Sequence, residues 1–155
     1  MYKKIMVPLD GSQLAECVLP HVEALVKGFS PRDVVLVRVV EPEDIPAYRV
    51  EGNILSQVTL DRESGRKSAA EDYLAQIGKR LKHEGTPLYT EVLIGRVTES
   101  LIDYAEQKGI DLIVIATHGR SGVTRWVRGS VADKILRSAN VPVLMVRAPG
   151  TSGGV

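Results

Sequence analysis

Residues 112–130 read LIVIATHGRSGVTRWVRGS, a short apolar run followed by a segment rich in glycine and arginine. Leu112–Ala116 shows no polar alternation, which is typical of a strand that is covered on both faces. Val131, Ile135 and Leu136 follow at the spacing of an amphipathic helix. A strand, a glycine-rich loop and a helix in that order predict one unit of an α/β domain with a parallel sheet.

The same alternation of elements extends along the rest of the chain. Further strands are predicted at Ile5–Leu9, Val34–Val40, Leu88–Ile94 and Val141–Val146. Apolar residues at spacings of three and four predict helices between them, within 14–25, 70–81, 97–105 and 131–136. Right-handed crossovers would place these helices on both faces of an open five-stranded parallel sheet. Pro20, inside the first helical pattern, predicts a kink or the loss of one backbone hydrogen bond.

Two segments lack a periodic pattern. Glu41–Val58 contains Pro42, Pro46 and Gly52 and is predicted to be a long loop, of the kind that is often a functional flap or a mobile segment. Residues 148–155 contain a proline and three glycines and are predicted to form a flexible tail. The remainder, residues 1–147, is predicted to be a single domain.

Composition and charge limit the possible partners. The 155 residues are 44% hydrophobic with a formal net charge of +1. We therefore expect no overall positive electrostatic field that would attract nucleic acid or membranes. Cys17 is the only cysteine, which excludes an internal disulfide. The chain begins without a signal-peptide pattern, and its apolar runs are too short to cross a bilayer. These features favour the cytoplasm.

Open α/β sheets bind ligands beyond the C-terminal strand ends, where the strand order reverses. Asp10 follows the first predicted strand, where its carboxylate could accept from a ribose hydroxyl or hold a metal ion. The structural alternative is that Asp10 and Ser12 cap the following helix. The sequence leaves both roles open.

The glycine-rich segment is the second candidate. Gly119 and Gly129 would let backbone N–H groups approach a ligand, and the helix that begins after Ser130 is a potential anion site. Ser130 and Asp133 could equally form a capping-box-like start, and both roles are compatible. No P-loop or dinucleotide-binding glycine motif is present, and the histidines lack metal-ligand spacing. His118, in the loop, is the one histidine for which we expect a ligand contact.

With these motifs the chain, from Tyr2 to Arg147, resembles the universal stress protein family. The family's Pro-x-Asp-x-Ser segment matches Pro8, Asp10 and Ser12. The motif of its ATP-binding branch, Gly-x₂-Gly-x₉-Gly-Ser/Thr, matches Ala116, Gly119, Gly129 and Ser130. Ala116 departs from this motif, because it places a β-carbon where the backbone approaches the ligand.

The resemblance implies an adenine nucleotide alpha hydrolase-like sheet with strand order 3-2-1-4-5. It also implies ATP, accompanied by Mg²⁺ or Mn²⁺, as the ligand. Asp10 would contact the ribose or the metal, and the backbone of Val39 would contact adenine. The other residues that would surround the nucleotide are Pro8, Leu9, Ile115, Ala116, His118, Gly119, Arg120, Gly122, Gly129, Ser130 and Val131.

The resemblance further implies a homodimer in which Val141–Val146 pairs across a two-fold axis, which would also protect an apolar edge strand. The function it favours is a nucleotide-binding regulatory dimer of the stress response. The alternative function is enzymatic: a slow ATPase, or a phosphoryl or nucleotidyl transferase, that uses the same pocket. A nucleotide-free interaction module is favoured only if Ala116 closes the pocket. We expect turnover to be slow or absent, because lysine is missing from the loop.

Overall fold

The computed structural model describes residues 1–42, 53–117 and 130–149. Five parallel strands form one sheet in the order β3-β2-β1-β4-β5, as the sequence predicted. The strands are β1 (Lys4–Pro8), β2 (Asp33–Val40), β3 (Leu88–Ile94), β4 (Leu112–Thr117) and β5 (Val143–Arg147). The helices are η1 (Ala15–Val18, a 3₁₀ turn), α1 (Leu19–Phe29), α2 (Asn53–Arg80), α3 (Val97–Lys108) and α4 (Val131–Ser138).

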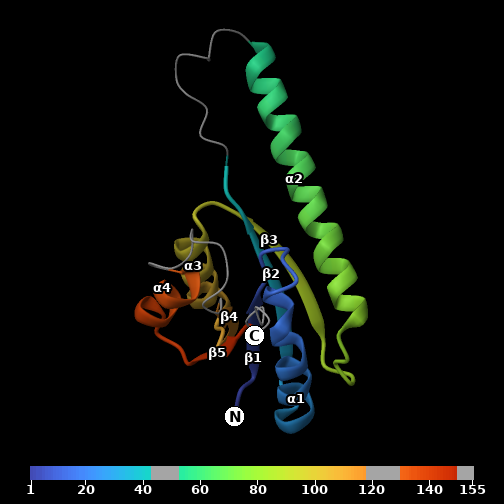
Figure 1. Cartoon of the computed structure of the whole chain (residues 1–155), viewed down its shortest axis with the longest axis vertical. Coiled ribbons are helices and arrows are strands. Elements are labelled where there is room, and N and C mark those ends of the chain that lie inside the picture. Colours follow the sequence, from blue (N-terminus) through green and yellow to red (C-terminus); the bar gives the residue numbers. More distant parts are fainter. Residues whose placement is uncertain (43–52, 118–129, 150–155) are drawn as a thin grey trace, which may run out of the picture.

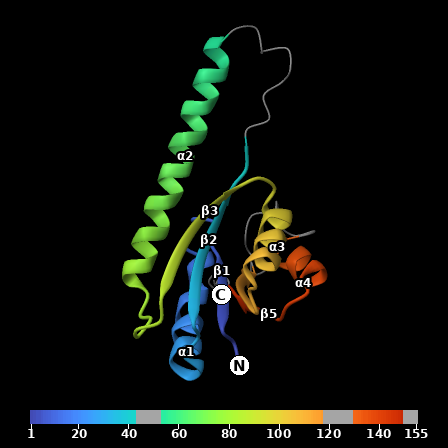
Figure 2. The ribbon, with the colours of Figure 1, turned by 180° about the vertical axis from the view of Figure 1, so that it is seen from behind.

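The helices cover both faces of the sheet, with α1 and α2 on one side and α3 and α4 on the other (Figures 1 and 2). Alternate residues of each inner strand point to opposite faces. Ile5 and Val7 accordingly join the core beneath α1 and α2, whereas Met6 joins the core beneath α3 and α4. Both sets of side chains are buried, which explains why the inner strands have no polar alternation.

The first helical pattern is divided at its proline. Residues 15–18 form the 3₁₀ turn η1, and α1 begins at Leu19 with Pro20 in its first turn. The N–H groups of a first turn have no intrahelical partner, so proline costs the helix no hydrogen bond there. The predicted interruption at Pro20 thus takes the form of a change of helix type, and the alternative prediction, the loss of a backbone hydrogen bond, is wrong.

The loop predicted for Glu41–Val58 is wrong at its C-terminal end, because α2 already begins at Asn53. Residues 43–52 lie outside the described part. The first half of α2 extends beyond the sheet, so it has no apolar surface to cover and needs no apolar stripe (Figure 1). The buried residues identified on α2, Ala70, Leu74 and Ile77, all lie in its second half.

The last strand also differs slightly from its prediction. It spans Val143–Arg147 rather than residues 141–146. Ala148, predicted to begin a flexible tail, is buried and donates its N–H to Thr117 O at 2.8 Å. Residues 150–155 lie outside the described part. Among the described helices, none is both long and apolar enough to span a membrane.

The strand order reverses between β1 and β4. Pairing of β1 with β2 continues to Pro8 and Val37, whereas pairing of β1 with β4 is confined to Ile5–Leu112 and Met6–Ile113. The ends of β1 and β4 beyond these pairs form the edge where open α/β sheets place their ligands.

Candidate functional site

A cavity of about 500 Å³ lies at this edge, within the size range of small-molecule pockets. It brings together residues from the ends of β1, β2 and β4 and the start of α4. Among the sequence-predicted residues, those that line it are Pro8, Leu9, Asp10, Val39, Ile115, Ala116, Ser130 and Val131. The predicted residues His118, Gly119, Arg120, Gly122 and Gly129 lie outside the described part. The ligand roles assigned to all of these residues remain predictions.

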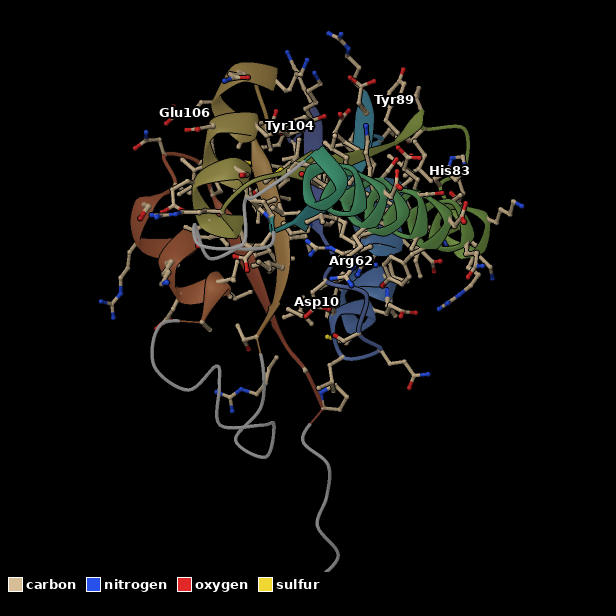
Figure 3. All side chains as sticks on the ribbon, turned by 90° about the horizontal axis from the view of Figure 1, so that it is seen from above. Asp10, Arg62, His83, Tyr89, Tyr104 and Glu106 are labelled. Atoms are coloured by element: carbon tan, nitrogen blue, oxygen red, sulfur yellow. The ribbon has the colours of Figure 1, made fainter. Side chains whose placement is uncertain are left out.

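Asp10 lies at the end of β1, on an exposed turn (Figure 3). Its Oδ1 accepts hydrogen bonds from the Ser12 amide at 2.8 Å and the Ser12 hydroxyl at 2.6 Å. Ser12 Oγ in turn accepts from the Ala15 amide at 3.2 Å, where η1 begins. No described residue donates a hydrogen bond to Asp10 Oδ2. Asp10 and Ser12 therefore order the turn that leads into η1, but they do not cap it as predicted, because its N-cap is Leu14 and has no side-chain cap hydrogen bond. The second carboxylate oxygen of Asp10 is left available to a ligand.

The peptide groups of Val39 lie beyond the ladder between β1 and β2. That ladder ends where the Leu9 amide donates to Val37 O at 2.8 Å. Alternate residues of a parallel strand direct their peptide groups to the same neighbour. On the opposite edge, Val40 O accepts from the Gly95 amide at 3.1 Å. The N–H and C=O of Val39 therefore face the β1 side, past the last β1 partner, where a planar ligand can pair with them.

The start of α4 supplies the anion-binding geometry. Ser130 is the N-cap, and its Oγ accepts from the Asp133 amide at 3.1 Å. This satisfies the third amide of the helix and leaves those of Val131 and Ala132, which have no intrahelical acceptor. Both residues line the cavity. The cap and an anion site thus coexist, because they use different N–H groups.

Arg38 and Arg66 also line the cavity, and the sequence analysis missed both. Arg38 is the one charged residue within the apolar run of β2 that follows Asp33, and this is a signal that could have identified it. Its Cζ lies over the Tyr73 ring, 5.3 Å from the centroid. Arg66 lies on the part of α2 predicted as neither strand nor helix, and its Nη2 donates to Glu41 O.

The hydroxyl group of Tyr73 is held by contacts of its own. Its hydroxyl donates to Glu16 Oε2 at 3.4 Å, and Glu16 Oε1 pairs with Arg80 Nη2 at 2.9 Å. Burial, followed by the adjacent Glu16 carboxylate, raises the pKa of Tyr73 well above its ordinary value. Tyr73 therefore stays neutral near pH 7 and joins α2 to η1.

Other candidate chemical groups lie outside the cavity. His83 Nδ1 is 2.7 Å from Thr86 O, and His21 is exposed on α1. Burial raises the pKa of the Cys17 thiol, which packs against the core. The described residues contain no group of three His, Cys, Asp or Glu side chains that could hold a metal ion.

The five-stranded parallel sheet with this strand order is that of the adenine nucleotide alpha hydrolase-like fold. The model of the universal stress protein family matches residues 1–147, and the chain belongs to that family. Universal stress protein MJ0531 of Methanocaldococcus jannaschii is 32% identical over 149 residues, covering 96% of this chain and 84% of the relative. MJ0577 of the same organism is 29% identical over 156 residues, covering 95% of this chain and 96% of the relative.

Solved structures agree with this assignment. The structure of MJ0577 has a TM-score of 0.79 at 26% identity and covers 97% of this chain and 99% of its own. UspA from Lactobacillus plantarum has a TM-score of 0.76 at 22% identity and covers 94% and 98%. A universal stress protein in complex with cAMP and one from Arabidopsis thaliana with AMP bound both have TM-scores of 0.61. Their identities of 18% and 12% show a shared fold alone.

Proposed function

We propose that this protein binds an adenine nucleotide in the cavity between the ends of β1 and β4 and acts as a regulatory switch in the stress response. The observation that carries the proposal is the convergence of three kinds of group on one cavity. These are the Asp10 carboxylate, the open peptide edge of Val39 and the free amides at the start of α4. They match a sugar, a base and a phosphate, respectively.

Ala116 does not argue against this ligand. It stands where the family's ATP-binding motif has glycine, and a β-carbon there could fill the site. The side chain is half-buried and packs against the core beneath α1 and α2. The cavity of about 500 Å³ exists with this methyl group in place. This supports a nucleotide site rather than a closed interaction module.

The residues also fit a divalent ion that accompanies ATP. Mg²⁺ is commonly held by one or two carboxylates together with the phosphates of its nucleotide. Asp10 and Glu41 are the carboxylates among the described residues that line the cavity, and Asp10 Oδ2 has no described donor. A bound ion would neutralise phosphate charge, and Asp10 would orient it. We therefore include Mg-ATP among the ligands.

The identity of the nucleotide can be read from the purified protein. Mass analysis of small molecules released by denaturation should find an adenine nucleotide, and ATP, AMP or cyclic AMP should raise the melting temperature of the emptied protein. GTP and CTP at equal concentration serve as controls, because Val39 offers a fixed pattern of one donor and one acceptor to the base. Absence of any adenine-specific shift at millimolar nucleotide would overturn the proposal.

We further propose that β5 pairs with β5 of a second copy to form a homodimer. β5 is an edge strand of the sheet, and Leu144 on it is 36% exposed. The Ile113 amide donates to Pro142 O at 3.0 Å, so the ladder to β4 uses the peptide groups of residues 142 and 144. The amide of Val143 consequently faces the open edge, where it could bond to a second strand.

We also propose the cytoplasm as the compartment of this protein. Its single cysteine, Cys17, cannot form an internal disulfide, and this supports a reducing compartment.

A further inference from the structure

Arg38 is the one charged residue of β2 other than Asp33, with which the strand begins. It follows Val37 on β2, points to the face covered by α1 and α2, and is half-buried. It lines the same cavity as Asp10. A guanidinium carries five N–H donors in a rigid plane, and the protein must give this group either a partner or access to solvent.

The guanidinium is oriented by two neighbours. A β-carbon built on Gly11 would stand 3.0 Å from Arg38 Cζ, 3.0 Å from Nη1 and 3.1 Å from Nη2. These nearly equal distances mean that one flat face of the guanidinium lies against the Gly11 backbone. Cζ also lies over the Tyr73 ring. Gly11 thus restrains one face of the guanidinium and the Tyr73 ring lies beside it, and neither residue accepts a hydrogen bond from its N–H groups.

No described residue makes a hydrogen bond or an ion pair with the guanidinium of Arg38. This includes Asp10, whose Oδ1 is engaged by Ser12. A restrained arginine with an open N–H edge in a cavity is suited to a bidentate contact with an anionic ligand group.

The position of Arg38 is distinct from the phosphate-binding start of α4. Val131 packs with the core beneath α3 and α4, whereas Tyr73, which Arg38 covers, packs with the core beneath α1 and α2. Asp10 directly precedes Gly11 in the chain, and the Arg38 guanidinium lies against Gly11. A ribose bound at Asp10 would therefore lie near Arg38. In dinucleotide-binding folds an acidic residue meets the ribose hydroxyls, and a nearby arginine accommodates a phosphate on that ribose.

We propose that Arg38 binds a phosphate ester on the ribose, and that the cavity therefore prefers adenine nucleotides that carry a 2′- or 3′-phosphate in addition to the 5′-phosphate. This inference rests on the proposed nucleotide site and names a specificity within it. One charge-assisted bidentate contact of this kind should strengthen binding by about tenfold.

The test is calorimetric titration of the emptied protein with AMP, adenosine 2′,5′-bisphosphate and adenosine 3′,5′-bisphosphate at fixed salt. We expect one bisphosphate to bind about tenfold more tightly than AMP. The better isomer identifies the hydroxyl that faces Arg38. Arg38→Gln should remove this preference while changing AMP affinity by less than about twofold, because only the ester phosphate loses a partner.

Arg32→Gln is the matched control, since it removes the same charge from an exposed residue that does not line the cavity. It should leave the preference intact. Equal affinities of the wild-type protein for AMP and both bisphosphates would overturn the role of Arg38, as would a preference that survives in Arg38→Gln. These results differ from failure of the proposed function, in which AMP itself would not bind, and which would overturn both proposals.

Discussion

Asp10 and Ser12 form a closed turn in which Asp10 Oδ1 accepts from both the amide and the hydroxyl of Ser12, at 2.8 and 2.6 Å. The turn leads into η1, because Ser12 Oγ also accepts from the Ala15 amide. One oxygen of the Asp10 carboxylate therefore stabilises the fold, and the other remains for a ligand. The two roles can be separated by substitution.

Asp10→Asn keeps an oxygen that can accept from Ser12, whereas Asp10→Ala removes it. We expect Asp10→Ala to lower the free energy of unfolding by about 1 kcal/mol and Asp10→Asn to change it by a few tenths. Both should weaken Mg-ATP binding, because both remove the negative charge. Urea unfolding and calorimetric titration measure the two effects. Undiminished Mg-ATP affinity in a folded Asp10→Asn protein would exclude Asp10 from the metal and ribose site.

Substitutions of Ser130 can likewise separate its capping of α4 from the binding of phosphate at the start of that helix. Ser130→Ala removes the acceptor of the Asp133 amide and should cost about 1 kcal/mol of stability. Ser130→Asp preserves the N-cap, and its charge suits the helix N-terminus. That same charge would repel a phosphate, so Ser130→Asp should lose ATP affinity while remaining as stable as the wild type. An Asp variant that binds ATP normally would place the phosphates away from α4.

Gly11 and Gly85 form a matched pair for the Arg38 contact. Both have left-handed backbones, with φ of +88° and +85°, but only Gly11 has an atom within 4 Å of a built β-carbon. Alanine at either position should cost about 1 kcal/mol through backbone strain. Only Gly11→Ala should displace the guanidinium of Arg38 and reduce the preference for a ribose phosphate. Thermal unfolding and calorimetry of the two variants compare these effects, and an equal preference in both would show that Gly11 does not orient Arg38.

The proposed dimer depends on the outward amide of Val143. Val143→Pro removes this donor without removing a hydrogen bond of the ladder to β4, so the monomer should fold while the dimer weakens. Leu144→Pro is the contrasting variant, because residue 144 belongs to that ladder and its loss should destabilise the monomer. Sedimentation velocity at low micromolar concentration measures the mass. A folded Val143→Pro protein that keeps its dimer mass would move the interface elsewhere.

The fold could be predicted from sequence because inner strands and packed helices leave an apolar signal. Met6 and Val7 are both buried although they point to opposite faces, and this produces the continuous run of β1. The first half of α2 could not be predicted, because it extends beyond the sheet and its few apolar residues end at Leu60, so no continuous stripe leads to the second half (Figure 1).

The candidate site was only partly predictable for a related reason. Asp10 directly follows a predicted strand, and Ser130 precedes a predicted helix with a recognisable capping pattern, so both positions could be identified. The interruption of an apolar strand marks Arg38 as unusual, but it does not show which residues its side chain contacts. Its proximity to Gly11 and Tyr73 depends on how β1, β2 and α2 pack together, and no local pattern encodes that arrangement.

The central claim, that the cavity at the β1–β4 edge holds the nucleotide, can be tested by filling the cavity from an exposed position. Ala69 lines the cavity yet is exposed on α2, so Ala69→Trp should obstruct the site at little cost to the fold. Ala75→Trp, at an exposed position on the same helix that does not line the cavity, is the control. In calorimetric titration with Mg-ATP, we predict that Ala69→Trp weakens binding at least tenfold, which corresponds to a loss of about 1.4 kcal/mol in binding free energy. Ala75→Trp should bind Mg-ATP as tightly as the wild type. Equal Mg-ATP affinity in all three folded proteins would contradict the account.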